Sequence, residues 1–357
     1  MEKLTYLVHW GKNKETAWSG TNYSLYKALC KYYQVDDINL KFPKLISVFM
    51  HRILRLDWFA GGFYELQYFR RKHKHLKGKV LQMSGIVDAD SETQSYIYND
   101  LSVSYVEYMM DKLPQVFAVS DFQHANPVLI HKQAVAQAKF YETCSAIFCM
   151  GHWLQKFLVD NGLPESKVVY VGGGGNIDSS LIQPRNKTKN KILFVGKDFK
   201  RKGGYVTYEA FRLLREQGEN VELYVAGPAT NPIQNPTEGY HYMGLVNFDA
   251  VAELFNKCDI FCMPSYFEAY GLVFIEALTF GLPCIGRDCY EMPYFIEEGK
   301  TGLLLKEDNP QELASLMKKT LQDDSFKKNV AARHDHYLEE YSWDAVARRM
   351  KEAMDEK

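Results

Sequence analysis

The chain has 357 residues, a formal net charge of −1 and an apolar fraction of 46%, which is sufficient for two domains that each have a core. Its seven cysteines are an odd number without C-x2-C spacing, which is typical of reduced core residues in a cytosolic protein. No apolar run reaches the ~18 residues of a membrane span, so we expect a soluble protein or one that binds a membrane peripherally.

The first predicted strand, residues 4–10, leads through a loop with Gly20 into a helix that reaches residue 33. A glycine and hydroxyl side chains at a helix start expose backbone N–H groups at the carboxyl edge of a parallel sheet. Most β-to-α loops contain a glycine, so the pattern by itself indicates a binding site only weakly.

Residues 44–79 form a basic stretch in which nine lysine and arginine residues outnumber two acidic ones and are mixed with aromatic side chains. A solvated helix face is the ordinary explanation, and contact with an anionic membrane surface is the functional alternative. We expect no nucleic-acid binding, because no nucleic-acid-binding motif accompanies the stretch.

Residues 79–84 predict the next strand, and Asp88 and Asp90 follow it. A D-x-D pair after apolar residues can hold a divalent cation against a diphosphate. Ser91 and Gln94, however, fit a capping box, so we predict that the two aspartates lie at the start of a helix and that no metal binds there.

Residues 116–120 predict a further strand, and the loop after it contains Asp121 and His124. A lone histidine in such a loop is more often structural than catalytic. Strands at residues 146–150 and 168–171 complete the first half, and the glycine run 172–175 predicts a flexible turn between domains.

The second half alternates strands with helices, which predicts a parallel sheet. Strands are expected at residues 191–196, 221–226, 258–263 and from residue 283, and helices at residues 203–217, 249–256 and 272–280.

Glu276 is the anomaly of the helix predicted over residues 272–280, because its neighbours are apolar on almost every side. A buried carboxylate is costly unless hydrogen-bond donors meet it. Either the 2′,3′-diol of a ribose or a nearby arginine or lysine would supply those donors, and the residues alone do not choose between them. Glu268 lies eight residues earlier, in a loop that ends at Gly271, where the N–H groups of the helix start favour a phosphate.

The segment PSYFEAYGLVFIEAL, with seven residues between Glu268 and Glu276, resembles the E-x7-E motif of retaining family 4 glycosyltransferases. Other segments between residues 146 and 305 resemble that family in order and spacing, namely ILFVGKDFKRKGG (192–204), LYVAGP (223–228), YMG (242–244) and GKTGL (299–303). The resemblance implies an α/β protein of GT-B fold, in which two Rossmann-like domains with parallel sheets face each other across a cleft.

The resemblance also implies roles for the residues around the motif. Glu276 would accept hydrogen bonds from the ribose of a nucleotide sugar, and Glu268 would contact a hydroxyl of the donor sugar. The backbone amides that would place the sugar and phosphate are those of Ala269, Tyr270, Gly271 and Leu272.

Four further residues take roles from the same resemblance. Lys197 and Lys202 would hold the diphosphate in place of a metal ion. The family usually has arginine and then lysine there, so Lys197 would keep the charge and lose the bidentate geometry. Gly20 would lie in the loop that covers the diphosphate, and His124 would lie at a strand end near the donor sugar, as a catalytic candidate with Glu268 and Lys202.

These features predict a retaining, metal-independent glycosyltransferase that moves a sugar from UDP- or GDP-sugar to a glycan or lipid-linked acceptor without a cofactor. We expect an acceptor-binding domain over residues 1–180, a nucleotide-sugar-binding domain over residues 181–341, and a helix over residues 342–357 that crosses back. The expected location is cytoplasmic, with peripheral contact at the inner face of the cytoplasmic membrane through residues 44–79. The alternatives are a nucleotide-sugar epimerase of the same fold and a non-catalytic nucleotide-sugar-binding protein.

Overall fold

The computed structural model describes residues 1–41 apart from 12, 16 and 19, and residues 43, 46, 68–69, 71–73, 76–83, 92–183 and 190–356. These residues form two compact units, unit 1 (Met1–Gly173 with Trp343–Lys357) and unit 2 (Gly174–Ser342). Asp88, Asp90 and most of the basic stretch 44–79 lie outside the described residues.

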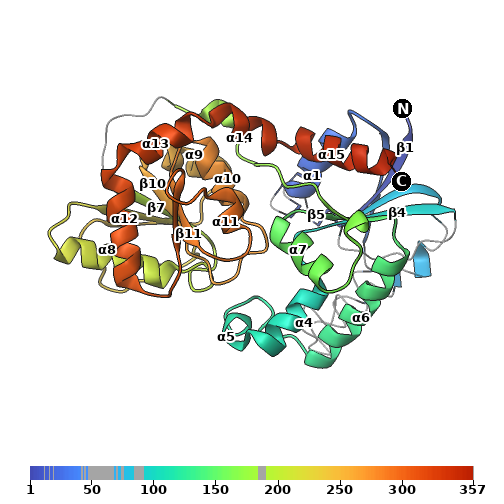
Figure 1. Ribbon diagram of the computed structural model, residues 1–357, viewed down its shortest axis with the longest axis horizontal. Helices are drawn as coiled ribbons and strands as arrows, with labels where there is room; N and C mark the ends of the chain where they lie inside the picture. Colours follow the sequence, from blue (N-terminus) through green and yellow to red (C-terminus); the bar gives the residue numbers. More distant parts are fainter. Residues whose placement is uncertain are drawn as a thin grey trace. The chain divides into compact units, whose positions relative to one another are not determined.

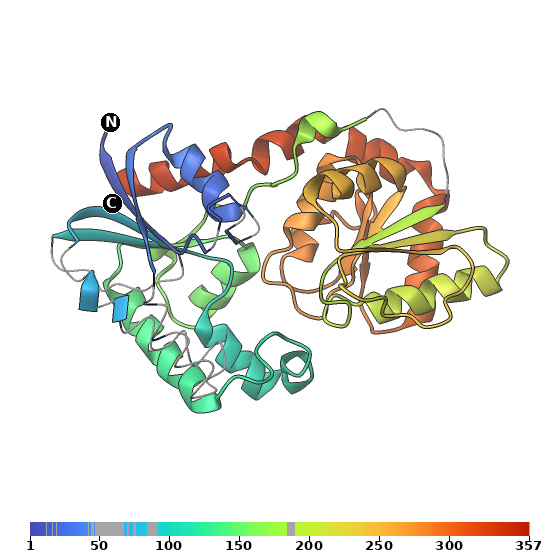
Figure 2. The same cartoon turned by 180° about the vertical axis from the view of Figure 1, so that it is seen from behind.

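Unit 1 is an α/β unit whose described part contains a six-stranded parallel sheet in the order β2-β1-β3-β4-β5-β6. Its strands are β1 (Lys3–Val8), β2 (Gln34–Asn39), β3 (Gly78–Met83), β4 (Thr93–Asn99), β5 (Ala146–Cys149) and β6 (Val168–Tyr170). Its helices are α1 (Thr21–Leu29), α4 (Val103–Lys112), α5 (Pro114–Phe117), α6 (Pro127–Thr143), α7 (His152–Asp160) and α15 (Trp343–Asp355). Helices α1 and α15 lie side by side on one face of this sheet, and α4 and α6 lie on the other (Figures 1 and 2).

Two predictions for unit 1 are wrong, although β3 confirms the strand predicted at residues 79–84. Residues 93–99 form strand β4 instead of the first turns of a helix, because their aromatic and β-branched side chains are buried in the sheet. Residues 116–120 form no strand. Pro114 opens the short helix α5 there, and the sheet position beside β4 belongs to β5, where Tyr96 pairs with Ala146.

The C-terminal helix α15 belongs to unit 1 and packs against α1. Its apolar face is buried through Val346 and Met350, and Lys31 Nζ lies 2.5 Å from Asp344 Oδ2. Near the end of the chain, the Tyr33 hydroxyl lies 3.6 Å from the sulfur of Met354. Helix α15 therefore belongs to the same unit as β1 and α1, although most of the chain separates them in sequence.

Unit 2 confirms the parallel sheet that the alternation of strands and helices predicts. Its described strands, in the order β12-β11-β10-β7-β8-β9, are β7 (Lys191–Val195), β8 (Glu222–Ala226), β9 (Tyr240–Gly244), β10 (Ile260–Cys262), β11 (Cys284–Arg287) and β12 (Gly302–Leu305). Its helices are α8 (Gly204–Glu216), α9 (Phe248–Lys257), α10 (Leu272–Thr279), α11 (Met292–Phe295), α12 (Pro310–Gln322), α13 (Asp324–Ala331) and α14 (His334–Glu340). Helices α8 and α12 cover one face, and α9 and α10 cover the other (Figure 1).

Local sequence explains where several of these helices begin. The Asn247 side chain accepts a hydrogen bond from the Ala250 N–H at the start of α9, and Asn309 caps α12 ahead of a proline at its first position. Helix α10 begins differently, at Gly271 with φ 101°, so no side chain caps it. None of the described helices combines the length and apolar composition that a membrane-spanning segment requires.

Candidate functional site

The candidate site of unit 2 lies at the carboxyl ends of β7 and β10, where the strand order of the sheet reverses. Strands β8 and β9 continue from β7 in one direction, and β11 and β12 continue from β10 in the other. The helices that follow β7 and β10 therefore lie on opposite faces of the sheet, and the loops that lead to them meet at its carboxyl edge. Ligands of open parallel sheets bind at such a switch point, and the sequence places Lys202 and Glu268 in these two loops.

Several contacts join the two loops. Lys202 Nζ lies 2.6 Å from Glu268 Oε2, and Arg201 Nη1 donates to the carbonyl oxygen of Phe267 at 2.9 Å. In the opposite direction, the Tyr266 N–H donates to the carbonyl oxygen of Arg201 at 2.9 Å. The loops therefore form one connected wall at the edge of the sheet.

Glu268 is held on one oxygen by two hydrogen-bond donors and a more distant arginine. Besides Lys202, the Ser265 hydroxyl lies 3.4 Å from Oε2 and Arg201 Nη1 lies 3.9 Å from it. The Glu268 and Lys202 side chains are 12% and 15% exposed, so the pair is largely desolvated and can still be reached by a ligand. An ion pair in that environment is worth more than one in open water.

Glu276 lies in the second turn of α10 and is 8% exposed. Its Oε1 accepts a hydrogen bond from the Asn176 N–H at 2.9 Å, and the Ile177 backbone N–H also donates to the carboxylate. Glu276 forms no ion pair within the described ranges, so the arginine or lysine partner considered from the sequence is not found there. Burial raises the pKa of Glu276 to about 7, although the two backbone donors act in the opposite direction.

The residues between the two glutamates form the start of α10. Gly271 adopts a left-handed conformation, and with no side chain at this position the N–H groups of Leu272 and Val273 lack a capping group. Ala269 is half-buried in the preceding loop, and Tyr270 is buried with its ring 5.0 Å from that of Phe295. An N-terminus of this kind favours an anion by its dipole and its N–H groups.

A comparison with protein families identifies this unit. The family described as "Glycosyl transferases group 1" matches residues 178–337. These residues form a group 1 glycosyltransferase domain. The resemblance to a glycosyltransferase family is thereby confirmed at the level of group 1, and the chain, with a parallel sheet in each α/β unit, has the GT-B fold.

A relative that covers most of the chain is also named a glycosyltransferase. The chain is 20% identical over 319 residues to an uncharacterized glycosyltransferase of Methanocaldococcus jannaschii, a match that spans 87% of this chain and 85% of that protein. The match spans 39% and 59% of the length of two further curated relatives.

Two solved structures show the same fold over nearly the full length. WaaG, a glycosyltransferase involved in lipopolysaccharide biosynthesis, has a TM-score of 0.66 at 15% identity, with 98% of each chain covered. HepE of Anabaena, in complex with UDP-glucose, has a TM-score of 0.65 at 13% identity, with 100% of each chain covered.

Lys197 lies in the same loop of the glycosyltransferase domain as Lys202, but its surroundings differ. Its side chain is exposed, and it forms no ion pair with any residue that the structure describes. The position of its side chain is therefore less constrained than that of Lys202, which is paired with the Glu268 carboxylate.

Gly20 and His124, the two assigned residues outside the glycosyltransferase domain, belong to unit 1. Gly20 has φ 89° and immediately precedes α1, in the loop after β1, so it lies at the carboxyl edge of its own sheet. His124 is exposed in a turn between α5 and α6. The role of His124 was predicted from a position at the end of a strand, and no strand directly precedes it. Its role therefore stays a prediction without structural support.

The backbones of the two loops pack closely, which explains why residue 203, directly before α8 of the glycosyltransferase domain, is a glycine. Gly203 has φ +76°, and a Cβ there would lie 2.4 Å from the carbonyl oxygen of Pro264. Gly218 has a similar φ of +82° with nothing within 4 Å. We expect Gly203→Ala to lower the free energy of unfolding by more than about 2 kcal/mol and Gly218→Ala by about 1 kcal/mol, measured by urea denaturation.

Equal losses in the two alanine variants would contradict the close approach of the loops, because the shared backbone strain would then account for both.

The sequence analysis missed two contributors to the candidate site. Arg201 contacts both Asp198 and Glu268, and its place directly before Lys202 in a run of basic residues was a usable signal. The second is the 175–177 segment, whose backbone meets Glu276. No pattern of side chains could have revealed it, because it acts through N–H groups.

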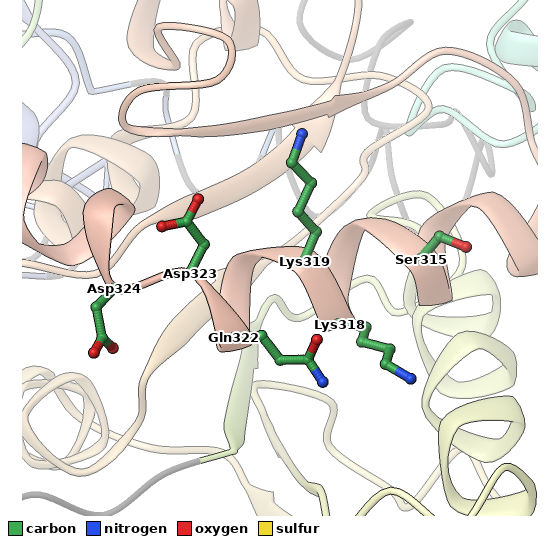
Figure 3. A pocket seen from close by; sticks show the side chains of 6 residues that line it. All are labelled: Ser315, Lys318, Lys319, Gln322, Asp323 and Asp324. Atoms are coloured by element: carbon green, nitrogen blue, oxygen red, sulfur yellow. The ribbon is translucent and has the colours of Figure 1, made fainter.

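A hollow on α12 is separate from this site. Figure 3 shows its lining side chains, with Lys318 and Lys319 pointing to different sides of the helix. Its lining residues are Ser315, Lys318, Lys319, Gln322, Asp323 and Asp324, none of which belongs to the loops after β7 and β10. Since the side chains diverge, they do not converge on a common ligand.

Proposed function

We propose that the protein is a retaining, metal-independent glycosyltransferase that transfers a sugar from UDP- or GDP-sugar to a glycan or lipid-linked acceptor. One observation supports this above the others. The uncapped start of α10 is flanked in the chain by Glu268, which is paired with Lys202, and by Glu276, whose buried carboxylate meets only backbone donors among the described residues. A nucleotide sugar supplies a diphosphate, sugar hydroxyls and a ribose diol that match these three features.

Each residue takes the role that the family resemblance implies. The ribose hydroxyls donate to Glu276, a donor-sugar hydroxyl meets Glu268, and the amides from Ala269 to Leu272 place the sugar and its phosphate. Lys202 lies on the diphosphate, with Lys197 as a second cation. The complex of HepE with UDP-glucose supports this class of donor.

The chemistry required of the protein is mainly stabilisation of the leaving group. The bond between the anomeric carbon and the phosphate oxygen breaks, the acceptor oxygen attacks from the same face, and the phosphate oxygen takes the acceptor's proton. Negative charge develops on the diphosphate, where Lys202 and the α10 N-terminus stabilise it. No nucleophilic side chain is required.

The acceptor class is supported more weakly. The basic stretch 44–79, together with the likeness to WaaG, favours a lipid-linked acceptor at an anionic membrane surface. Sedimentation with anionic and with neutral liposomes tests this contact, and equal sedimentation with both would count against it.

A panel of UDP- and GDP-sugars in a thermal-shift assay identifies the donor, and the donor found is then incubated with glycan and lipid-linked acceptors. Transfer with retained anomeric configuration, unaffected by a metal chelator, is the expected result. Conversion of the donor sugar without an acceptor would favour an epimerase. Binding with neither transfer nor hydrolysis across the acceptor panel would favour a non-catalytic binding protein.

A further inference from the structure

The Glu268 loop, residues 264–268, is backed along its length by another part of unit 2, residues 287–290. This backing segment begins at the last residue of β11. Arg287 Nε donates to the carbonyl oxygen of Pro264 at 3.2 Å, and the Cys289 sulfur lies 3.9 Å from the carbonyl oxygen of Ser265. The backing segment therefore contacts the backbone of the Glu268 loop at two neighbouring residues.

Aromatic contacts join the same two segments. The Arg287 guanidinium lies 4.3 Å from the centre of the Tyr266 ring, and the Tyr290 ring lies 5.3 Å from that of Phe267, edge to face. Tyr290 has φ 54°, an uncommon conformation for a bulky residue. Such a conformation persists only where the surrounding packing enforces it, and here it presents the ring to the residue before Glu268.

Asp308, in the loop after β12, completes the arrangement. It accepts hydrogen bonds from Arg287 Nη2 at 2.9 Å and from the Tyr266 hydroxyl at 2.8 Å. Arg287 is 12% exposed and thus joins the loops that follow β10, β11 and β12 with one side chain. A planar guanidinium can stack on a ring and donate in two directions at once, whereas a lysine ammonium cannot do both.

We propose that Arg287 is a positioning residue that fixes the Glu268 loop, and through it the Glu268–Lys202 pair, for the diphosphate end of the donor. The inference rests on the proposed function, because it assigns a purpose to the same site. Arg287 itself need not touch the ligand. Its effect should appear in the binding of a nucleoside diphosphate and not in that of the nucleoside, which meets Glu276 on α10.

The first test measures the loop without any ligand. Hydrogen exchange of the amides at residues 265–268 is compared among the unaltered protein, Arg287→Ala and the control Arg212→Ala, which removes an arginine that pairs with Glu209 and Glu216 on α8. We expect Arg287→Ala to speed exchange at least about tenfold in this loop, and Arg212→Ala to leave it unchanged. Unchanged exchange in Arg287→Ala would overturn the inference.

The second test measures binding of UDP and of uridine, or of GDP and guanosine, to the same variants and to Arg287→Lys. Arg287→Ala should weaken the diphosphate about tenfold and the nucleoside less than about twofold, with partial rescue in Arg287→Lys. Equal weakening of both ligands would show a merely structural role. Absence of nucleotide binding by the unaltered protein would overturn the proposed function and this role of Arg287 in it, whereas the exchange result still decides whether Arg287 fixes the loop.

Discussion

Glu276→Gln is expected to weaken UDP or GDP binding at least about tenfold while making the free protein more stable at pH 8. Binding suffers because glutamine is a poorer acceptor for the two ribose hydroxyls. Stability rises because a neutral amide replaces a carboxylate that is 8% exposed and meets only backbone donors among the described residues. Calorimetric titration and urea denaturation of both proteins measure the two effects.

The pH dependence follows from the sign of the pKa shift. The pKa of Glu276 is raised from 4.5 to about 7, so between these values the folded state binds more protons than the unfolded state. Stability therefore falls as pH rises through this window, by up to about 3 kcal/mol above pH 7. The two proteins should be nearly equally stable near pH 4.5 and diverge toward pH 8.

Nucleotide binding should reverse part of this shift. Hydroxyl donors favour the charged carboxylate and lower its pKa, so a fraction of a proton is released on binding at pH 7, and calorimetry in two buffers of different ionisation enthalpy detects it. Glu276→Gln should abolish this release. A variant that loses stability at pH 8 and keeps its nucleotide affinity would show that the carboxylate serves the fold instead of a ligand.

Lys202→Ala is expected to weaken diphosphate binding about 30- to 100-fold and nucleoside binding less than about twofold. The reason is the position of Lys202 Nζ, 2.6 Å from Glu268 Oε2 in the wall that follows β7 and β10. Removal of the ammonium takes away a charge that the diphosphate needs and leaves Glu268 with Arg201 as its nearest cation, at 3.9 Å. Calorimetric titrations with UDP or GDP and with the corresponding nucleoside measure the two affinities separately.

Lys156→Ala provides the matched control for Lys202→Ala. Lys156 is an exposed lysine on α7 that pairs with Asp160 four residues away, so its loss should leave both affinities unchanged. If Lys202→Ala weakened the binding of the diphosphate and of the nucleoside by the same factor, the result would contradict the proposed role of Lys202 at the diphosphate.

The local sequence pattern was sufficient to predict structure or family where a regular alternation of elements or a short motif indicates it. The alternation of apolar strands and helices predicts the parallel sheet of unit 2, and the segment around Glu268 and Glu276 indicates the family. It failed in unit 1, where β4 carries a helix-start signal at its beginning and residues 116–120 have a strand-like composition. There, pairing of β5 with β4 decides the sheet, and residues distant in sequence set that pairing.

Burial and helix signals are local, so the amino-acid sequence is sufficient to predict one carboxylate within an apolar helix and a second one before the start of that helix. The partners of the two carboxylates depend on the three-dimensional fold. Glu276 meets a backbone N–H 100 residues away, and Glu268 meets a lysine 66 residues away. The order of strands in the sheet explains the contact between Glu268 and Lys202, since it brings the loops after β7 and β10 to one edge, and composition does not encode that order locally. The contact of Glu276 depends on the 175–177 segment, which precedes β7 in the chain.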